Sequence, residues 1–268
     1  MILDHVRRGV KETSIPPASS FDRQTAKTTV TSFRIVEALD RHESARVTDL
    51  AADLDFAKGT VHKHLTTLRE VGYVVQEGDE YRLSVRFLGL GTSARLNLDL
   101  YEIAYDPLKK LADATGEVAS IMIPEHGYGV YALRVSNEGR PDVDIREGES
   151  VPLTATAGGK AILSYTPEAE RDRIIERHGL PDLTDATITD REALDAELRR
   201  IRDRRLANDK GEYRSEQHCV ANPIVDDDEV AIGAVTVSGP ADRMTEKSVE
   251  ADFASLVGST TASIESRL

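Results

Sequence analysis

The hydrophobic pattern of residues 29–83 predicts three helices followed by a β-hairpin. Apolar residues recur at helical spacing in the first stretch, which ends near Asp40. A second, short helix is expected to begin with Thr48 as its N-cap, and a third to run from Gly59 to Val71, with Gly72 as its stop. Two short strand patterns, 73–76 and 81–83, then flank the turn 77–80. This order of elements is that of a winged helix-turn-helix.

The third helix of this group has one apolar side and one polar side. Val61, Leu65 and Leu68 recur at i, i+4 and i+7, so they should face the core. In a helix-turn-helix the opposite side enters the major groove of DNA. We therefore expect DNA contacts from this helix and from the hairpin, at Lys58, Gly59, Thr60, His62, Lys63, Thr66 and Arg82. The alternative is a solvated amphipathic helix of an ordinary small domain.

Two histidines of this helix invite separate interpretations. His64 lies at the edge of the apolar stripe, so we expect it to be packed at the core boundary rather than to contact DNA. His62 and His64 are two residues apart and would point about 200° away from each other on a helix, so they cannot share a metal ion. We expect no metal and no cofactor.

The pattern after the hairpin predicts a long helix and then a mixed domain. Residues 94–115 have helical periodicity, which we expect to be interrupted at Pro107 and closed by Gly116. Strand and helix patterns follow, which indicates an α+β or α/β domain. The strands are expected at 118–123, 130–135, 220–225 and 230–237, and the helices at 159–165, 167–178, 191–204 and 246–267. The predicted organisation is a flexible leader at 1–21, a winged domain at 22–92, a linker or dimerisation helix at 93–115, and a second domain at 116–268.

The charge of the chain is strongly negative and unevenly distributed. The formal net charge is −13, yet residues 22–92 carry ten Lys and Arg against eleven Asp and Glu. Acidic runs such as 226–229 indicate a salt-adapted cytoplasm of the kind found in halophilic archaea, although an ordinary acidic protein remains an alternative. At 1 M salt the Debye length is about 3 Å, which mutes repulsion between an acidic protein and DNA.

The composition excludes several classes of protein. No run of eighteen apolar residues is present, so we expect no membrane span and no membrane partner. The first residues lack the apolar stretch of a signal peptide, which favours a cytoplasmic location. Cys219 is the only cysteine, which excludes an internal disulfide and cysteine-rich zinc modules.

Three segments carry a family resemblance. The segment Leu54 to Gly91, LDFAKGTVHKHLTTLREVGYVVQEGDEYRLSVRFLGLG, resembles the DNA-binding half of IclR-type transcription regulators. Residues 151–161 and 219–240 are similar to two motifs of the C-terminal half of that family. There are departures: Ala57 and Gly59 stand where Ser or Pro is common, His64 replaces a usual Leu, and 209–214 differs from the frequent form.

The resemblance implies a GAF-like effector domain with a central antiparallel sheet and a pocket for a small metabolite, often a carboxylate. The residues at the matching positions, or at the adjoining helix start, are Ala157, Gly158, Gly159, Asp209, Cys219, Thr236 and Ser238. Backbone N–H groups at a helix starting near Lys160 could bind an anion, and the two hydroxyls of the last strand share one face. The alternative is that the glycines only allow a tight turn and the hydroxyls are ordinary sheet residues.

The function implied is that of a ligand-responsive regulator, repressor or activator, of catabolic or metabolic genes. Its expected partners are an operator in double-stranded DNA, a small-molecule effector and further copies of the chain, as a homodimer or a dimer of dimers. One alternative is a sensor that uses its winged domain for protein contacts. Another is a metabolic enzyme with a regulatory head, which is disfavoured because 158–161 lacks the full phosphate-loop pattern and His218 and Cys219 are strand neighbours on opposite faces. We therefore expect no catalytic residues.

Overall fold

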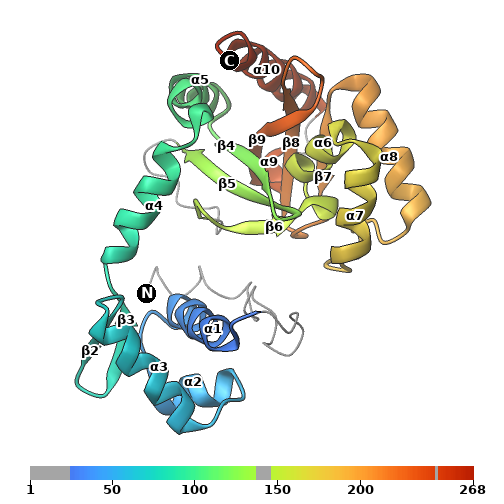
Figure 1. Cartoon of the computed structure of the whole chain (residues 1–268). Helices are drawn as coiled ribbons and strands as arrows, with labels where there is room; N and C mark the ends of the chain where they lie inside the picture. Colours follow the sequence, from blue (N-terminus) through green and yellow to red (C-terminus); the bar gives the residue numbers. More distant parts are fainter. Residues whose placement is uncertain (1–24, 137–145, 245–246) are drawn as a thin grey trace. The chain divides into compact units, whose positions relative to one another are not determined.

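The computed structural model describes residues 25–136, 146–244 and 247–268 (Figure 1). The predicted leader, 1–21, lies outside the described residues. The chain divides into two compact units that meet between Ala94 and Arg95, and each is described by itself.

The first unit contains three helices and a small sheet. Its helices are α1 (Lys27–His42), α2 (Val47–Asp53) and α3 (Lys58–Glu70). Its strands β1 (Ala45–Arg46), β2 (Val74–Glu77) and β3 (Glu80–Leu83) form an antiparallel sheet in the order β1-β3-β2. Ile35, Leu39, Leu50, Val61 and Leu65 are completely buried together in its core. The predicted winged helix-turn-helix is thus the observed arrangement.

The start of α2 differs from the prediction. The N-cap position belongs to Arg46 rather than Thr48, because the helix begins at Val47. The backbone N–H of Arg46 donates to the carboxylate of Asp49 at 3.1 Å, and this contact defines the helix start. The two-residue strand β1 was not predicted, because so short a strand has no periodicity and exists only through its pairing with β3.

The predicted linker helix is two helices, α4 (Arg86–Leu96) and α5 (Asp99–Thr115). The interruption lies between Leu96 and Asp99, not at Pro107, which is inside α5 and buried. Proline costs an α-helix one hydrogen bond, and the carbonyl oxygen of Ile103, four residues before Pro107, instead accepts a hydrogen bond from Nη1 of Arg267 at 3.4 Å. Gly116 closes α5 with a φ of +68°, as expected from a C-terminal glycine.

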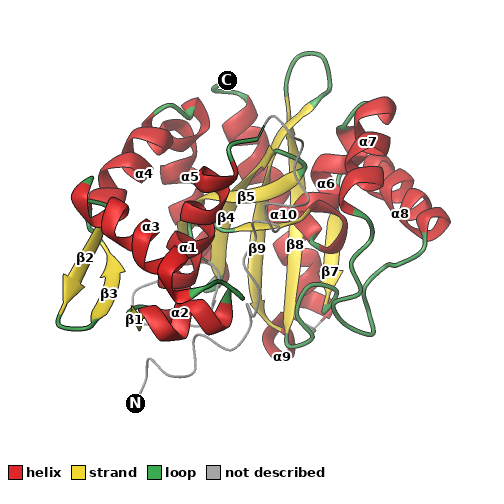
Figure 2. Ribbon diagram, turned by 60° about the horizontal axis from the view of Figure 1, so that its bottom comes forward, coloured by secondary structure: helices red, strands yellow, loops and turns green. Residues whose placement is uncertain are grey.

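The second unit is built around one antiparallel sheet of six strands (Figure 2). The strand order is β6-β5-β4-β9-β8-β7. The strands are β4 (Val118–Glu125), β5 (Tyr128–Val135), β6 (Ser150–Pro152), β7 (Ala207–Lys210), β8 (Gln217–Val225) and β9 (Ala231–Pro240). The short edge strands β6 and β7 were not predicted. The expectation of an α+β chain with a central antiparallel sheet in its second domain is confirmed.

Helices cover both faces of this sheet (Figure 1). On one face α5 and α10 (Lys247–Glu265) pack with the sheet around a core that includes Leu108, Ile121 and Val237. On the other face the principal helix is α6 (Ala157–Tyr165), whose core includes Met122, Leu163 and Ala221. A 3₁₀ turn at Leu153–Ala155 leads into α6, and the remaining helices are α7 (Glu168–His178), α8 (Arg191–Arg204) and α9 (Ala241–Met244).

Candidate functional site

The exposed side of α3 carries most of the predicted DNA contacts. Val61 and Leu65 are buried, so the helix presents its other side to solvent. Five of the six predicted residues of this helix are exposed, and Thr66 is half-buried: the exposed ones are Lys58, Gly59, Thr60, His62 and Lys63. Lys58 and Lys63 enter no ion pair that the structure shows within residues 25–136, so both charges are available to a phosphate.

His64 is a packing residue, as predicted. Its Nδ1 lies 2.8 Å from the hydroxyl of Ser32 on α1, and the two groups share a hydrogen bond. Burial, and then the positive charge of Lys63, lower the pKa of His64. A neutral imidazole at neutral pH therefore joins α3 to α1.

Arg82 of the hairpin is half-buried and paired with Glu77. Its Nε and Nη2 donate to one carboxylate oxygen of Glu77 at 2.9 Å and 2.5 Å. Both side chains are partly exposed, and such surface pairs contribute only about 0–1 kcal/mol. Arg82 can thus exchange Glu77 for a phosphate at small cost, but its charge is not free in this structure.

Arg86 holds the C-terminal end of α3, which the sequence analysis did not predict. Its Nη1 donates to the carbonyl oxygen of Val71 at 2.8 Å, and its guanidinium lies 4.8 Å from the ring centre of Tyr73. Arg86 is the first residue of α4, so this contact connects α4 to the end of α3. A basic residue at this position was visible in the sequence, but its partner was not.

A pocket opens on the second unit, on the face of the sheet that α6 covers. It is lined by residues of β5, β7, β8 and β9, of the loop between β7 and β8, and of the N-cap of α6, namely Tyr131, Thr156, Asp209, Tyr213, Arg214, Gln217, His218, Cys219 and Ser238. Three of the seven predicted effector residues, Asp209, Cys219 and Ser238, are among them. The other four, Ala157, Gly158, Gly159 and Thr236, lie outside the lining.

The start of α6 explains why the glycines are not in the pocket wall. The helix begins at Ala157 rather than near Lys160, with Thr156 as its N-cap. The N–H of Gly159 donates to the hydroxyl of Thr156 at 3.2 Å, so one of the N–H groups expected to bind an anion is already used. A Cβ at Gly159 would lie 2.2 Å from the carbonyl oxygen of Leu153, so this glycine is required by close packing.

Ser238 and Cys219 are direct partners across β8 and β9. They are paired in the strand register, and the Ser238 hydroxyl donates to the Cys219 sulfur at 3.2 Å. Burial raises the pKa of the Cys219 thiol to about 12, although the hydrogen bond from Ser238 favours the thiolate. The thiol is therefore protonated near neutral pH and is not an activated nucleophile. Thr236 alternates with Ser238 as predicted, but it is completely buried.

Asp209 begins the turn that forms one wall of the pocket. Its Oδ1 accepts hydrogen bonds from the N–H groups of Glu212 at 2.6 Å and Tyr213 at 3.4 Å. The residue is only 6% exposed, and burial raises the pKa of its carboxyl to about 7. Asp209 can thus present either a neutral or a charged carboxyl group to the pocket near neutral pH.

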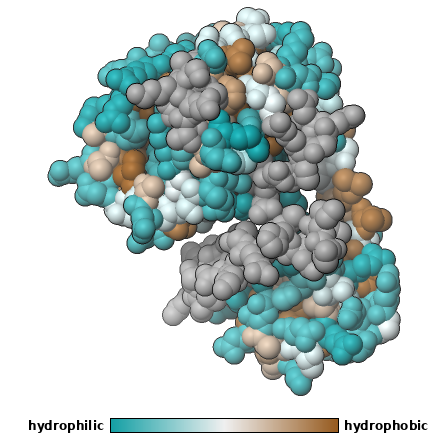
Figure 3. Space-filling model, turned by 180° about the vertical axis from the view of Figure 1, so that it is seen from behind, coloured by the Kyte–Doolittle hydropathy of each residue, from teal (hydrophilic) through white to brown (hydrophobic). Residues whose placement is uncertain are grey.

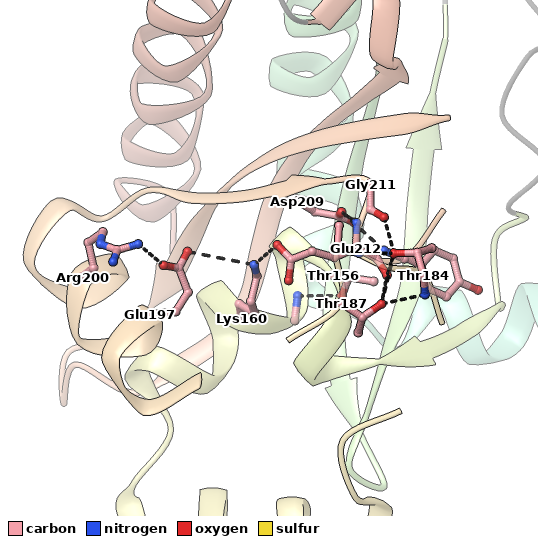
Figure 4. A network of polar contacts seen from close by, with 12 residues as sticks. Thr156, Lys160, Thr184, Thr187, Glu197, Arg200, Asp209, Gly211 and Glu212 are labelled. Carbon is pink, nitrogen blue, oxygen red and sulfur yellow. Dashed lines mark hydrogen bonds and ion pairs between the residues drawn. The ribbon is translucent and has the colours of Figure 1, made fainter. Parts of the chain in front are cut away.

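A buried ion pair fixes this turn from one side (Figure 4). The Lys160 ammonium, on a side chain that is 1% exposed, donates to Glu212, and Glu197 of α8 lies 4.0 Å away. From the other side the hydroxyls of Thr184 and Thr187 donate to the carbonyl oxygens of Gly211 and Glu212, both at 2.6 Å. This ion pair was not predicted from the sequence, because Lys160 and Glu212 are 52 positions apart in the chain.

Neither a metal-binding cluster nor a membrane-spanning helix is found among the described residues. In the parts of the chain that are described, no three His, Cys, Asp or Glu side chains are grouped so that they could hold a metal ion. No described helix is both long and apolar enough to cross a bilayer.

Comparison with known families decides between the remaining interpretations. The family described as "IclR helix-turn-helix domain" matches residues 31–78, and "Bacterial transcriptional regulator IclR C-terminal" matches residues 92–266. The chain belongs to the IclR family. It is thus a DNA-binding transcription regulator, and the hypothesis of a metabolic enzyme with a regulatory head is set aside because the family and its named relatives are regulators.

Relatives and solved structures agree with this assignment. The HTH-type transcriptional regulator KdgR of Escherichia coli is 29% identical over 220 residues, which cover 81% of this chain and 84% of KdgR. The crystal structure of the Thermotoga maritima IclR has a TM-score of 0.73 and 26% identity, over 91% of this chain and 99% of that one. An IclR homolog from Microbacterium hydrocarbonoxydans, complexed with 4-hydroxybenzoate, has a TM-score of 0.74 and 20% identity, over 89% of this chain and 98% of that one.

Proposed function

We propose that this IclR-family regulator reads its operator with the exposed side of α3 and controls nearby catabolic or metabolic genes. The observation that carries the proposal is the group of exposed polar residues at the N-terminal half of α3, with Lys58 and Lys63 at its ends. The N-terminal part of a recognition helix makes most base contacts in this class of motif. Lys58 and Lys63 supply phosphate or guanine contacts, and Thr60 and His62 supply hydrogen bonds to bases.

A mobility-shift assay tests this function. The probe is the promoter region beside the protein's own gene, and the salt concentration is varied from moderate to high. We expect a shifted band that Lys63→Ala weakens, whereas Lys109→Ala, an exposed lysine of α5 in the second unit, leaves it unchanged. A protein that shifts no intergenic DNA near its gene would overturn the proposal that it controls nearby genes.

We further propose that a small effector, with a carboxylate as its anionic group, binds in the pocket around Asp209, Cys219 and Ser238. The support is that these three predicted residues come together on neighbouring strands and line one cavity. The Microbacterium homolog holds a small aromatic carboxylate, 4-hydroxybenzoate, which supports this class of ligand for the family fold. Effector binding would favour one arrangement of the DNA-reading heads over another.

Calorimetry with small carboxylic and sugar acids tests the pocket. We expect at least one acid to bind, and Ser238→Ala to weaken its binding. Ser164→Ala serves as the control, because Ser164 is also buried but its hydroxyl donates to a carbonyl within α6. An affinity that is equal in wild type and Ser238→Ala would place the effector elsewhere.

The operator-binding form is proposed to be a homodimer, or a dimer of dimers, acting in the cytoplasm. The support lies on α4, which has no buried residue although it carries several large apolar side chains. Leu88, Leu90 and Leu96 of α4 are all more than half exposed, and so is Val85 directly before the helix. Figure 3 shows exposed apolar surface in brown at its right edge. Two-fold operators usually require two heads, and an apolar helix of this kind supplies a surface that would hold them together.

A further inference from the structure

Arg134 is a positively charged residue beside the proposed effector pocket, and it has no role in the function proposed above. It lies on β5, and its guanidinium stands 4.9 Å from the ring centre of Tyr131, which lines the pocket. Its Nη1 is buried and has no hydrogen-bond partner in the residues that the structure describes. Arginine stays charged in proteins and has five donors, so a buried, unpaired Nη1 is costly unless a ligand completes it.

The charge of Arg134 acts on the pocket itself. Burial lowers the pKa of Arg134, while its interactions with Tyr131, Glu149 and Cys219 raise it. The positive charge of Arg134 in turn opposes the rise in the pKa of Tyr131 and of Cys219. Arg134 is therefore electrostatically coupled to two lining residues, although it is not part of the lining.

Arg214 is a second arginine at this place, and it does line the pocket. Its side chain is 14% exposed and lies 4.0 Å from the carboxylate of Glu149. Glu149 also interacts with Arg134, so one carboxylate faces two guanidinium groups. Glu147 also lies at this end, because its carboxylate accepts a hydrogen bond from the backbone N–H of Arg134 at 3.0 Å. Two guanidinium groups therefore lie together at this end of the pocket, and the Nη1 of Arg134 keeps a donor that no described group accepts.

We propose that Arg134 is a specificity-determining residue of the effector pocket, which selects anionic ligands by binding their carboxylate together with Arg214. The inference rests on the proposed effector function and names the residue that carries its selectivity. A planar guanidinium forms paired, charge-assisted hydrogen bonds with a carboxylate, which a neutral ligand of the same shape cannot match. The far end of the ligand then meets Ser238 and the Asp209 carboxyl.

If Arg134 had only a structural role, its replacement would have a different effect. If the guanidinium only packs on Tyr131, its loss should change the stability of the fold and leave ligand selectivity alone. Arg134→Met keeps an unbranched side chain over the ring without its charge. Arg134→Lys keeps the charge without the planar fork. The two variants therefore separate packing, charge and geometry.

The experiment is calorimetry on the full chain with carboxylates and the corresponding neutral amides. The probes are benzoate, 4-hydroxybenzoate and pyruvate, each with its amide, and the proteins are wild type, Arg134→Met, Arg134→Lys and Arg214→Gln. Arg199→Met is the control, because Arg199 is an exposed arginine of α8. We expect at least one carboxylate to bind while its amide does not, and Arg134→Met to weaken that binding about 10- to 100-fold. Arg134→Lys should be intermediate, and Arg199→Met unchanged.

Three results would overturn the inference: an amide that binds as tightly as its carboxylate, an unchanged Kd in Arg134→Met, or no binding by any of the three carboxylates. Thermal unfolding of each variant, followed by circular dichroism, shows whether it is folded. If Arg134→Met fails that check, Arg214→Gln and Arg134→Lys carry the test. If the wild type binds the operator but the proposed role of Arg134 fails, the regulator function still stands. Failure of the inference can therefore be distinguished from failure of the proposed function.

Discussion

At the residue scale, Asp209 shows how burial changes a side chain whose role the sequence suggested. Its carboxyl is almost out of contact with water, which raises its pKa. The hydrogen bonds that it accepts from two backbone N–H groups lower the pKa by less than burial raises it. In the folded protein the carboxyl therefore has a pKa of about 7, against about 3.9 in an unfolded chain. Between these values the folded state binds more protons than the unfolded state.

This difference predicts how Asp209 affects stability against pH. A raised carboxyl pKa stabilises the fold fully below about pH 4, and that contribution is lost as the pH rises through about 7. The melting temperature of the wild type should thus fall, relative to that of Asp209→Asn, between pH 5 and pH 8. Thermal unfolding of both proteins across this range measures it. A constant difference, or one that grows in favour of the wild type with pH, would contradict the assignment.

The two glycines at the start of α6 give a second prediction for single residues. A Cβ at Gly159 would lie 2.2 Å from the Leu153 carbonyl oxygen, which is backbone and cannot move aside. A Cβ at Gly158 would meet the Met122 sulfur and a Thr236 methyl at 2.9 Å, and these side chains can shift. We expect Gly158→Ala to cost about 1–3 kcal/mol of unfolding free energy, as overpacking does, and Gly159→Ala to cost more. Urea unfolding of both variants checks the order, and equal losses would argue against the packing explanation.

At the scale of elements, the turn between β7 and β8 is held by contacts from α6, α8 and the loop before α8. The Lys160 and Glu212 pair joins α6 to the turn, and Thr184 and Thr187 hold its carbonyl groups (Figure 4). Burial raises the pKa of Glu212, and the charge of Lys160 opposes this. The pair therefore fixes the wall of the pocket only while both charges are present.

Removal of one partner of this pair should be more harmful than removal of both. Lys160→Met leaves the Glu212 carboxylate buried without a cation, which typically costs about 3–5 kcal/mol. The double variant Lys160→Met/Glu212→Gln should recover much of that loss, because no buried charge remains. Lys109→Met is the control, since its pair with Asp113 is exposed. Urea unfolding gives the four free energies, and a loss below about 1 kcal/mol in Lys160→Met, as for a surface pair, would refute the argument.

At the scale of the whole molecule, the exposed apolar side chains of α4 require an explanation. Leu88 and Leu96 are each 73% exposed, and they lie on the same side of the helix as Thr92. We propose that a second copy of the chain covers these apolar side chains. The winged unit is also nearly neutral within an acidic chain, so attraction to DNA in general should be weak and the pairing of two heads correspondingly important.

This hypothesis predicts an oligomer that a charge on α4 disrupts. Leu88→Asp should shift the protein toward the monomer in analytical ultracentrifugation and weaken operator binding. Leu183→Asp, at an exposed leucine of the second unit, should change neither. A wild type that sediments as a monomer at micromolar concentration, or a Leu88→Asp protein that remains a dimer, would show that α4 is not the interface.

The sequence by itself determined the elements whose signal is local. The apolar positions of α3 predicted its buried side, because helical periodicity depends only on neighbouring residues. Strand-like local composition likewise predicted β4, β5, β8 and β9, and ordered motifs predicted the family. The break before α5 was wrongly predicted at Pro107. Proline disfavours a helix interior through its own backbone, which the sequence shows, whereas its burial inside α5 depends on the rest of the fold.

The tertiary structure alone decided which of the predicted residues meet. Lys160 and Glu212 are 52 positions apart, and Cys219 and Ser238 are 19 apart, so no local pattern reveals either contact. Packing against Leu153 gave Gly159 a structural role, and the sheet brought Arg134 beside Tyr131 and Cys219. Local sequence specifies a helix or a strand through its own backbone and side-chain periodicity, whereas a pocket is made by residues that become neighbours only when the sheet has assembled.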